Sequence, residues 1–383
     1  MSVELISESI SVNFSDFLRE QENYDSIYKL HIGEPKYKVH KKIISSVKIN
    51  LSGNSYSNSR GDIELRKEIC KKLKISNKIN TDYKRNILIT NGAIHAINIS
   101  ISLLINEGDE CIILEPYWKA YESLVILNKG IPVFVNLGVN KKFKDIVSEI
   151  KDKISSKTKL IILNFPNNPT GQLINEKDFE ELTDVIIKKN IFLISDEVYE
   201  DFIYNEKDRF SPGSIDSIKD NIISVFSFSK SYGMTGYRIG YLVANLNIVS
   251  NALKLSQYSI TCLSPAYQKG ALKAIHLNKY KNKGVLKFFN RINYVKELIL
   301  NTKLEDKIIF PKSGFYLLYD ISKHKMSSLD CAKKIVFEYN ISLCPGVAFG
   351  KNFDSYLRIS LTENKSDLKI IFDRLLIFEN QFK

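Results

Sequence analysis

A lysine directly after an apolar run is the residue of this chain best placed to act as a nucleophile. Lys230 follows residues 221–226, which are predicted to form a buried strand, and open α/β sheets bind ligands beyond such strand ends. Desolvation and nearby cations lower the pKa of an amine there, so that it can form a Schiff base. Arg238 follows eight residues later, beyond two glycines, and its fork of N–H donors suits phosphate. Taken alone, a lysine after a strand is more often a solvated surface residue.

A carboxylate and a phenol follow another predicted strand. Asp196 and Tyr199 come after residues 191–194, in the motif Ser-Asp-Glu-Val-Tyr. A carboxylate in this position is usually exposed or caps a helix. The apolar strand before it favours partial burial, which would require a cationic partner.

An amide and the only tryptophan of the chain also lie beyond strand ends. Asn168 belongs to residues 165–171, where two prolines, two asparagines and a glycine predict a rigid turn that can aim the amide inward. Trp118 follows the predicted strand 111–114 and can stack on a planar ring, although a lone tryptophan is more often packed in a core.

Two further features suit anions. Gly92 lies between the predicted strand 86–90 and a helix over 96–104, and free N–H groups at such a helix start make a seat for phosphate. Every α/β protein has several turns of this kind. Arg358 is the odd residue in the apolar strand 356–361, because a buried arginine is rare unless it is paired. Its partner is either a substrate carboxylate, bound through two parallel hydrogen bonds, or an internal acidic residue.

The elements that position these residues alternate between strand and helix over about residues 85–245. This pattern predicts an α/β fold with a doubly wound, mostly parallel sheet and helices on both faces. The candidate residues of this region would then meet at the carboxyl ends of the strands. Beyond residue 277 the pattern changes to a long helix followed by shorter strands and helices.

Composition narrows the class of protein. The chain has 383 residues, of which 44% are hydrophobic and 26% charged, and no apolar run approaches the roughly eighteen residues of a membrane span. No secretory signal is visible, and five cysteines without a CxxC pair indicate reduced thiols in a cytoplasm rather than disulfides or a metal site. The net charge of +12 comes mainly from scattered lysines, which favours a solvated basic surface over a nucleic-acid partner.

Together these residues resemble the class I/II, fold type I aminotransferases that depend on pyridoxal phosphate. The resemblance covers about residues 31–362. Its most specific motifs, in chain order, are Asn-Asn-Pro-Thr-Gly at 167–171, Ser-Asp-Glu-Val-Tyr at 195–199, and the stretch 227–238 that carries the lysine and an arginine. Gly-Glu-Pro at 33–35 and Arg358 complete the set.

The resemblance implies a role for each residue around the ring of the cofactor. Lys230 would form a Schiff base with pyridoxal 5'-phosphate and later move the substrate proton, and Asp196 would pair with the pyridine nitrogen. Tyr199 and Asn168 would bind the phenolic oxygen, and Trp118 would stack on the ring.

The resemblance also implies the groups that bind phosphate and substrate. Arg238, Ser227 and the backbone N–H groups of Ala93 and Ile94 would hold the phosphate, and Tyr56 would reach it from the neighbouring subunit of a homodimer. The substrate α-carboxylate would bind Arg358, with Gly33 and Asn168 beside it. The remaining partners would be an L-amino acid and a 2-oxo acid, without nucleic acid or membrane.

The expected domains are an N-terminal arm and part of a small domain over residues 1–50, a large cofactor-binding domain over 51–277, and a C-terminal small domain over 278–383. The N- and C-terminal segments together would form a smaller α+β domain.

Three functions remain open at this point. A ping-pong aminotransferase is favoured, in part because Gln172 follows the 167–171 motif. A β-elimination lyase or a cyclase on the same fold is the alternative. A transcription regulator of this fold would need a DNA-binding domain, and only about thirty residues precede the glycine at 33. Residues 36–40 and Ile94 depart from common family patterns at the substrate entrance, and Lys36 or Arg60 is a candidate to reach a side-chain carboxylate.

Overall fold

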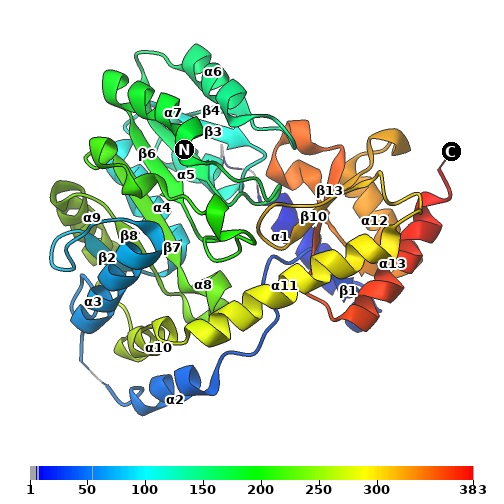
Figure 1. Ribbon diagram of the computed structural model, residues 1–383, viewed down its shortest axis with the longest axis horizontal. Helices are drawn as coiled ribbons and strands as arrows, with labels where there is room; N and C mark the ends of the chain where they lie inside the picture. Colours follow the sequence, from blue (N-terminus) through cyan, green and yellow to red (C-terminus); the bar gives the residue numbers. More distant parts are fainter. Residues whose placement is uncertain (1–5, 7, 54, 383) are drawn as a thin grey trace.

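The computed structural model describes residue 6, residues 8–53 and residues 55–382 (Figure 1). Residues 1–5, 7, 54 and 383 of the expected domain ranges lie outside this description. The centre is a seven-stranded sheet in the order β2-β8-β7-β6-β5-β3-β4. Its strands are β2 (Ile87–Thr90), β3 (Glu110–Glu115), β4 (Ile131–Asn136), β5 (Thr158–Asn164), β6 (Phe192–Asp196), β7 (Ile222–Ser227) and β8 (Gly240–Val243).

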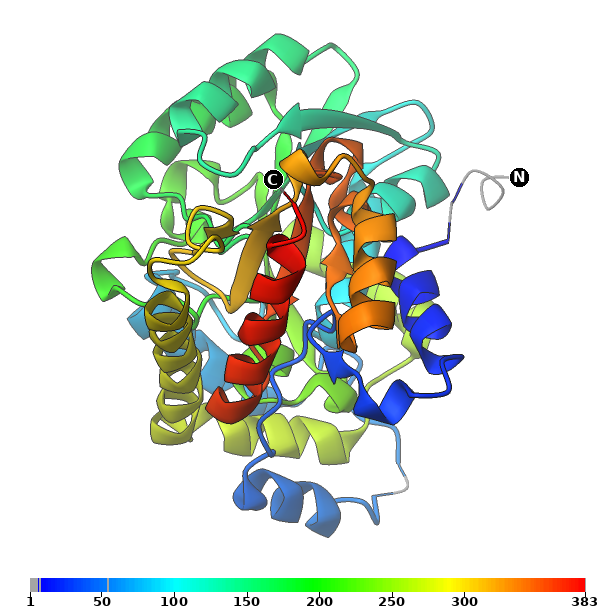
Figure 2. The same ribbon diagram turned by 90° about the vertical axis from the view of Figure 1, so that its right-hand side faces the viewer.

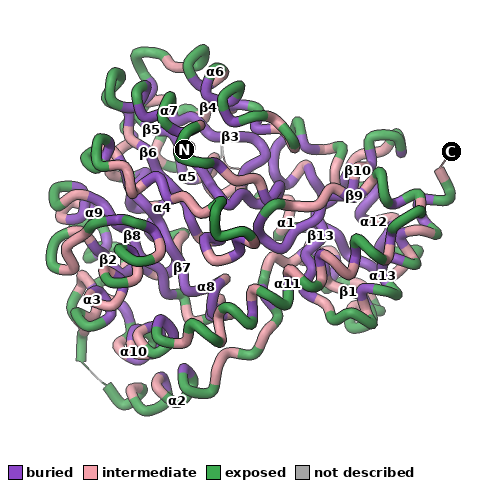
Figure 3. The backbone as a smooth tube through the Cα atoms, in the orientation of Figure 1, coloured by how far each residue is buried: buried purple, intermediate pink, exposed green. Residues whose placement is uncertain are grey.

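Helices cover both faces of this sheet, as the apolar strands predict. Ile112 and Ile161 belong to the core on one face, and their chain neighbours Ile113 and Ile162 belong to the core on the other, which is the two-residue period of a strand. One face packs on α4 (Gly92–Leu104), α5 (Ala120–Leu127) and α9 (Leu246–Ile260). The other packs on α3 (Ile63–Lys72), α6 (Phe143–Lys153), α7 (Glu176–Lys189) and α10 (Pro265–Ile275). In Figure 3 the sheet is accordingly the buried centre of this layer.

The directions of the strands bring the candidate residues to one end of the sheet, where the parallel strands have their carboxyl ends. Strands β3 to β7 are parallel, whereas β8 is antiparallel to both β7 and β2. The start of β8 therefore lies beside the ends of its neighbours, and Gly240 is paired with Ser227 on one side and with Thr90 on the other. The doubly wound, mostly parallel sheet of the prediction is confirmed, with the antiparallel strand as an added detail.

A second, smaller layer combines the two ends of the chain (Figure 2). It contains the sheet β12-β13-β10-β9 and the pair β1-β11. The strands are β1 (Tyr28–Lys29), β9 (Ile308–Ile309), β10 (Tyr316–Asp320), β11 (Ile341–Ser342), β12 (Cys344–Pro345) and β13 (Tyr356–Ser360). The helices are α1 (Ile10–Arg19), α12 (Ser328–Tyr339) and α13 (Lys365–Glu379). Phe14 and Leu30 share one core with Leu357 and Phe372, so the N-terminal segment packs with the C-terminal one.

Three remaining helices join or flank these layers. The helix α11 (Asn278–Ile299) runs from the central layer to the second one in Figure 1, α2 (Lys41–Ile49) packs on α10, and α8 (Phe228–Ser231) follows β7. Within the described residues, no helix is both long and apolar enough to cross a membrane.

Candidate active site

A cavity of about 830 Å³ lies beyond the carboxyl ends of the parallel strands, where the central layer meets the second layer. Eleven of the twelve predicted site residues line it: Gly33, Ala93, Ile94, Trp118, Asn168, Asp196, Tyr199, Ser227, Lys230, Arg238 and Arg358. Tyr56 is the exception, because it is 88% exposed and does not line the cavity of its own subunit.

Lys230 reaches the centre of this cavity from α8. Its Nζ donates a hydrogen bond to the carbonyl oxygen of Gly33 at 2.7 Å. Burial lowers the pKa of Lys230 to about 8; the Glu34 carboxylate opposes this shift, and the guanidinium groups of Arg358 and Arg238 add to it. The amine is thus easier to deprotonate than an ordinary lysine, as a nucleophile requires.

Asp196 is a buried carboxylate at the end of β6. Its Oδ2 accepts a hydrogen bond from the Tyr121 hydroxyl at 2.5 Å, and its Oδ1 accepts one from the backbone N–H of Val198 at 3.2 Å. Burial raises the pKa of Asp196 to about 6. No cation of the described residues forms an ion pair with it, so the site has place for a positively charged ligand atom beside this carboxylate.

Arg358 enters the cavity from β13 in the second layer and is buried. Its Nη1 donates to Asn168 Oδ1 at 3.0 Å and its Nη2 to the carbonyl oxygen of His31 at 2.6 Å. Its Nε has no partner, and no carboxylate in the described part of the chain forms an ion pair with it. This geometry disfavours the internal salt bridge and leaves a buried cation available to a ligand carboxylate.

Two tyrosines and a glycine pack beside Arg358 at this end of the cavity. The hydroxyls of Tyr199 and Tyr316 are 2.8 Å apart and share a hydrogen bond, and the guanidinium carbon of Arg358 lies 4.3 Å from the ring centre of Tyr316. A Cβ at Gly33 would lie only 2.5 Å from the Tyr316 hydroxyl oxygen, so only glycine fits here without displacing the tyrosine.

The opposite end of the cavity is suited to an anion. Gly92 opens α4 with a φ of +74°, and a Cβ there would lie 2.5 Å from Arg238 Nη2, so the guanidinium lies against the first turn of the helix. The N–H groups of Ala93 and Ile94 belong to that turn and have no acceptor within the helix. Arg238 itself has a φ of +55°, an unusual conformation for a non-glycine residue that turns the chain into β8.

Comparison with known proteins decides the family. The family model for aminotransferases of class I and II matches residues 25–375. The chain belongs to this aminotransferase family. It is similar to a probable aspartate aminotransferase of Methanocaldococcus jannaschii, with 35% identity over 89% of this chain and 90% of the relative. It is also similar to aromatic-amino-acid aminotransferase 2 of Thermococcus litoralis, with 30% identity over 92% of this chain and 91% of the relative.

Solved structures agree with the fold of this aminotransferase. The crystal structure of an aspartate aminotransferase from Thermotoga maritima superposes with a TM-score of 0.90 at 27% identity, and the match covers 99% of each chain. The protein is therefore a transaminase of fold type I that depends on pyridoxal phosphate, and the predicted family, fold, enzyme class and cofactor are confirmed.

The residues of this aminotransferase fit the cofactor. The buried Asp196 carboxylate suits a protonated pyridine nitrogen, since it has hydrogen-bond donors but no ion-pair partner among the described residues. The first turn of α4 with Arg238 suits a phosphate at the far end. Lys230 lies in the same cavity with a lowered pKa, as a residue that binds an aldehyde needs.

Several residues of the site were not predicted from the sequence. Tyr121 holds Asp196, Tyr316 holds Tyr199, and the backbone of His31 holds Arg358. Tyr121 lies three residues after Trp118 and Tyr316 begins β10. Their sequence positions gave a weak signal at best, because tyrosines are common in this chain and these contacts cross between distant segments.

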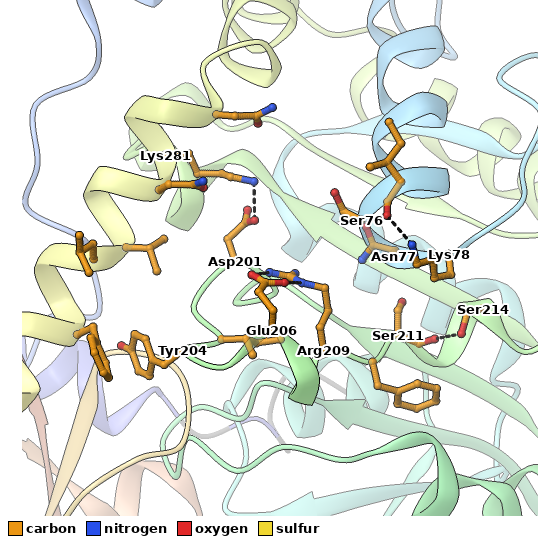
Figure 4. Close-up of a pocket in the computed structure, with 18 of the residues that line it drawn as sticks. Ser76, Asn77, Lys78, Asp201, Tyr204, Glu206, Arg209, Ser211, Ser214 and Lys281 are labelled. Carbon is orange, nitrogen blue, oxygen red and sulfur yellow. Dashed lines mark hydrogen bonds and ion pairs between the residues drawn. The ribbon is translucent and has the colours of Figure 1, made fainter.

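A second cavity of about 750 Å³ lies between α11, residues 75–78 and residues 201–214 (Figure 4). It contains none of the predicted site residues. Lys281 pairs with Asp201 at 2.6 Å and Arg209 with Glu206 at 2.8 Å, so these charges already compensate one another. The first cavity is therefore the candidate active site.

Proposed function

We propose that this aminotransferase moves the amino group of an L-amino acid to a 2-oxo acid in a ping-pong reaction around Lys230. The observation that carries the proposal is Arg358, a buried guanidinium with an unpartnered Nε and no acidic partner among the described residues. An amino acid bound there by its α-carboxylate would place its Cα near Lys230, because Arg358 contacts the His31 carbonyl and Lys230 contacts the Gly33 carbonyl, two residues further along the chain.

Proton transfer is the task of Lys230 in this proposal. Bound pyridoxal phosphate supplies an electron sink for the negative charge that remains when the α-proton leaves. Lys230 Nζ accepts that proton from Cα, and a pKa of about 8 suits a base that works near neutral pH. The Gly33 carbonyl, which accepts a hydrogen bond from Nζ, orients the amine.

The other residues position and tune the reactants. Asp196 keeps the pyridine nitrogen protonated and is itself oriented by the Tyr121 hydroxyl. Tyr199 and Asn168 would bind the phenolic oxygen, and Trp118 would cover the ring. The phosphate group would be held by Arg238, Ser227 and the N–H groups of Ala93 and Ile94.

The assembly is a homodimer in this proposal, with Tyr56 reaching the phosphate of the neighbouring subunit. It is supported by the exposure of two large aromatic side chains, Tyr56 at 88% and Tyr258 at 95%, which a second subunit would cover. We also propose that the chain divides into three segments, the N-terminal arm over residues 1–50, the large domain over 51–277 and the C-terminal small domain over 278–383.

We propose a cytoplasmic location as well. It is supported by five cysteines that are all unpaired.

Incubation of the holoenzyme with one amino donor and no acceptor tests the reaction type. A transaminase converts its bound cofactor stoichiometrically to the pyridoxamine form and releases one equivalent of 2-oxo acid. A β-elimination lyase would instead release ammonia over many turnovers while the cofactor stays in the aldehyde form. Continuous ammonia release without conversion of the cofactor would overturn the proposal.

A further inference from the structure

We propose that the donor of this aminotransferase carries an uncharged, apolar or aromatic side chain rather than the second carboxylate of aspartate or glutamate. This inference rests on the proposed function, since it assumes that the α-carboxylate binds Arg358. It deepens that function by assigning the substrate class.

The placement of the side chain follows from the two ends already assigned. The α-carboxylate lies at Arg358 and the reacting carbon near Lys230. The rest of the cavity wall, which neither end uses, is formed by α1, by the segment before Gly33 and by the loop after β12. Its small or apolar members there are Ser11, Val12, Ser15, Ile32, Ala348 and Phe349, and its charged members outside the two ends are Glu34 and Lys119.

Within one subunit, the described cations that line the cavity leave none for a second carboxylate. Besides Lys230, Arg238 and Arg358, the only lysine or arginine of the described residues in its wall is Lys119. The ammonium of Lys119 is paired with the carboxylate of Glu122, one turn further along the chain.

The two cations considered from the sequence are also engaged elsewhere. Lys36 is paired with Glu363, and neither residue lines the cavity. Arg60 donates to the backbone carbonyl of Lys84 at 2.6 Å and does not line the cavity of its own subunit either.

Besides Asp196, the acidic residue among the described lining residues is Glu34, and its charge adds repulsion. Glu34 lines the same cavity, and its carboxylate is close enough to raise the pKa of Lys230 against the effect of burial. A second substrate carboxylate would therefore meet the like charge of Glu34 and, within the subunit, no cation of the described residues that is free to pair with it.

An apolar side chain meets a complementary surface instead. Phe349 is buried, and the guanidinium carbon of Arg358 lies 5.0 Å from its ring centre, so this ring borders the carboxylate site directly. Ile32 precedes Gly33 and extends this wall. The wall thus offers aromatic and branched apolar contacts to a phenyl or isobutyl group.

The test uses the holoenzyme and two independent readouts. The first is the single-donor half-reaction with phenylalanine, leucine and methionine against aspartate and glutamate, where we expect kcat/KM to favour the apolar donors by on the order of 10²-fold. The second is calorimetric binding of two unreactive carboxylates, 3-phenylpropionate and succinate, where we expect 3-phenylpropionate to bind more tightly.

The two readouts separate failure of the inference from failure of the proposed function. Preference for aspartate together with tighter binding of succinate would overturn the inference while leaving transamination intact. Tighter binding of 3-phenylpropionate without conversion by any amino acid would support the apolar site and refute the proposed function.

A variant that introduces a positive charge on α1 tests whether the substrate side chain lies beside this helix. Val12 is 54% exposed, so Val12→Lys should fold, and it should raise kcat/KM for aspartate and succinate affinity about tenfold while lowering those for phenylalanine and 3-phenylpropionate. Val12→Gln, of similar length but neutral, is the control and should not raise the aspartate values. Equal values in both variants would overturn the placement of the side chain beside α1.

Discussion

Arg358 Nη1 donates a hydrogen bond to Asn168 Oδ1 at 3.0 Å, although 190 residues separate them in the chain. Asn168 lies beyond β5 of the central sheet and Arg358 lies in β13 of the second sheet. The bond therefore joins a residue assigned to the cofactor with a residue assigned to the substrate. The cavity around it exists only when both layers are packed together.

Replacement of Lys230 should abolish covalent attachment of the cofactor. In Lys230→Ala, borohydride reduction should leave no pyridoxyl group on the protein, and turnover should fall to background, because the other lysine of the described residues that lines the cavity, Lys119, is paired with Glu122. Mass spectrometry of the reduced protein measures this. Lys67→Ala, at an exposed lysine paired with Glu64, is the control and should behave like the parent. Full activity in Lys230→Ala would contradict the assignment of Lys230 as the residue that binds the cofactor.

Replacement of Arg358 by lysine should weaken donor binding more than turnover. The ammonium of Arg358→Lys cannot form two parallel bonds with a carboxylate, so we expect a loss of about 1.5–3 kcal/mol, or roughly 10- to 150-fold in kcat/KM. Arg374→Lys is the control, since that arginine donates to the carbonyl oxygen of Tyr339 outside the cavity. An unchanged KM for the donor in Arg358→Lys would argue against carboxylate binding by Arg358.

Neighbouring acidic residues should respond differently to loss of their charge. Asp196→Asn removes the buried partner of the pyridine nitrogen and should cost about 3–5 kcal/mol, roughly 150- to 5,000-fold in the half-reaction rate. Burial raises the pKa of Glu197 to about 8, so its carboxyl is already largely protonated at pH 7, and Glu197→Gln should have a small effect. Stopped-flow absorbance of both variants measures the rates. Equal losses would mean that general packing, rather than charge, explains the effect.

The lowered pKa of Lys230 should be visible in the apoprotein. Burial favours the neutral amine, so the pKa is about 8 and the amine gains reactivity as the pH rises through that value, whereas ordinary lysines, with a pKa of about 10.4, do so later. Pulse acetylation across a pH series, read by mass spectrometry, gives the midpoint for each lysine. A midpoint of Lys230 equal to that of exposed lysines would contradict the effect of burial.

Subunit mixing should reveal whether Tyr56 acts across a dimer. Tyr56→Ala should weaken cofactor binding about tenfold through the lost phosphate contact. If Tyr56 reaches the neighbouring site, a mixed dimer of Tyr56→Ala and Lys230→Ala subunits contains one site with both native residues, and mixing should restore activity at low cofactor concentration. Mixing that restores nothing, with mixed dimers confirmed by native mass spectrometry, would place Tyr56 outside the neighbouring site.

The sequence by itself determined the family, the fold class and the strand ends that carry the site. Apolar runs of strand length, polar residues directly after them and three ordered motifs are local features, and local features are readable without a structure. Lys230, Asp196 and Asn168 each follow a predicted strand, and all three line one cavity.

Only the tertiary structure decided how these residues act on one another. The Tyr121 hydroxyl on Asp196, the free Nε of Arg358 and the pairing of Lys119 with Glu122 depend on contacts between side chains whose directions no local pattern fixes. Burial has the same origin, since it lowers the pKa of Lys230 and raises that of Asp196 only after the layers have excluded water. The residue types therefore determine which reaction the site can support, whereas the charge states of these residues and the substrate preference depend on packing.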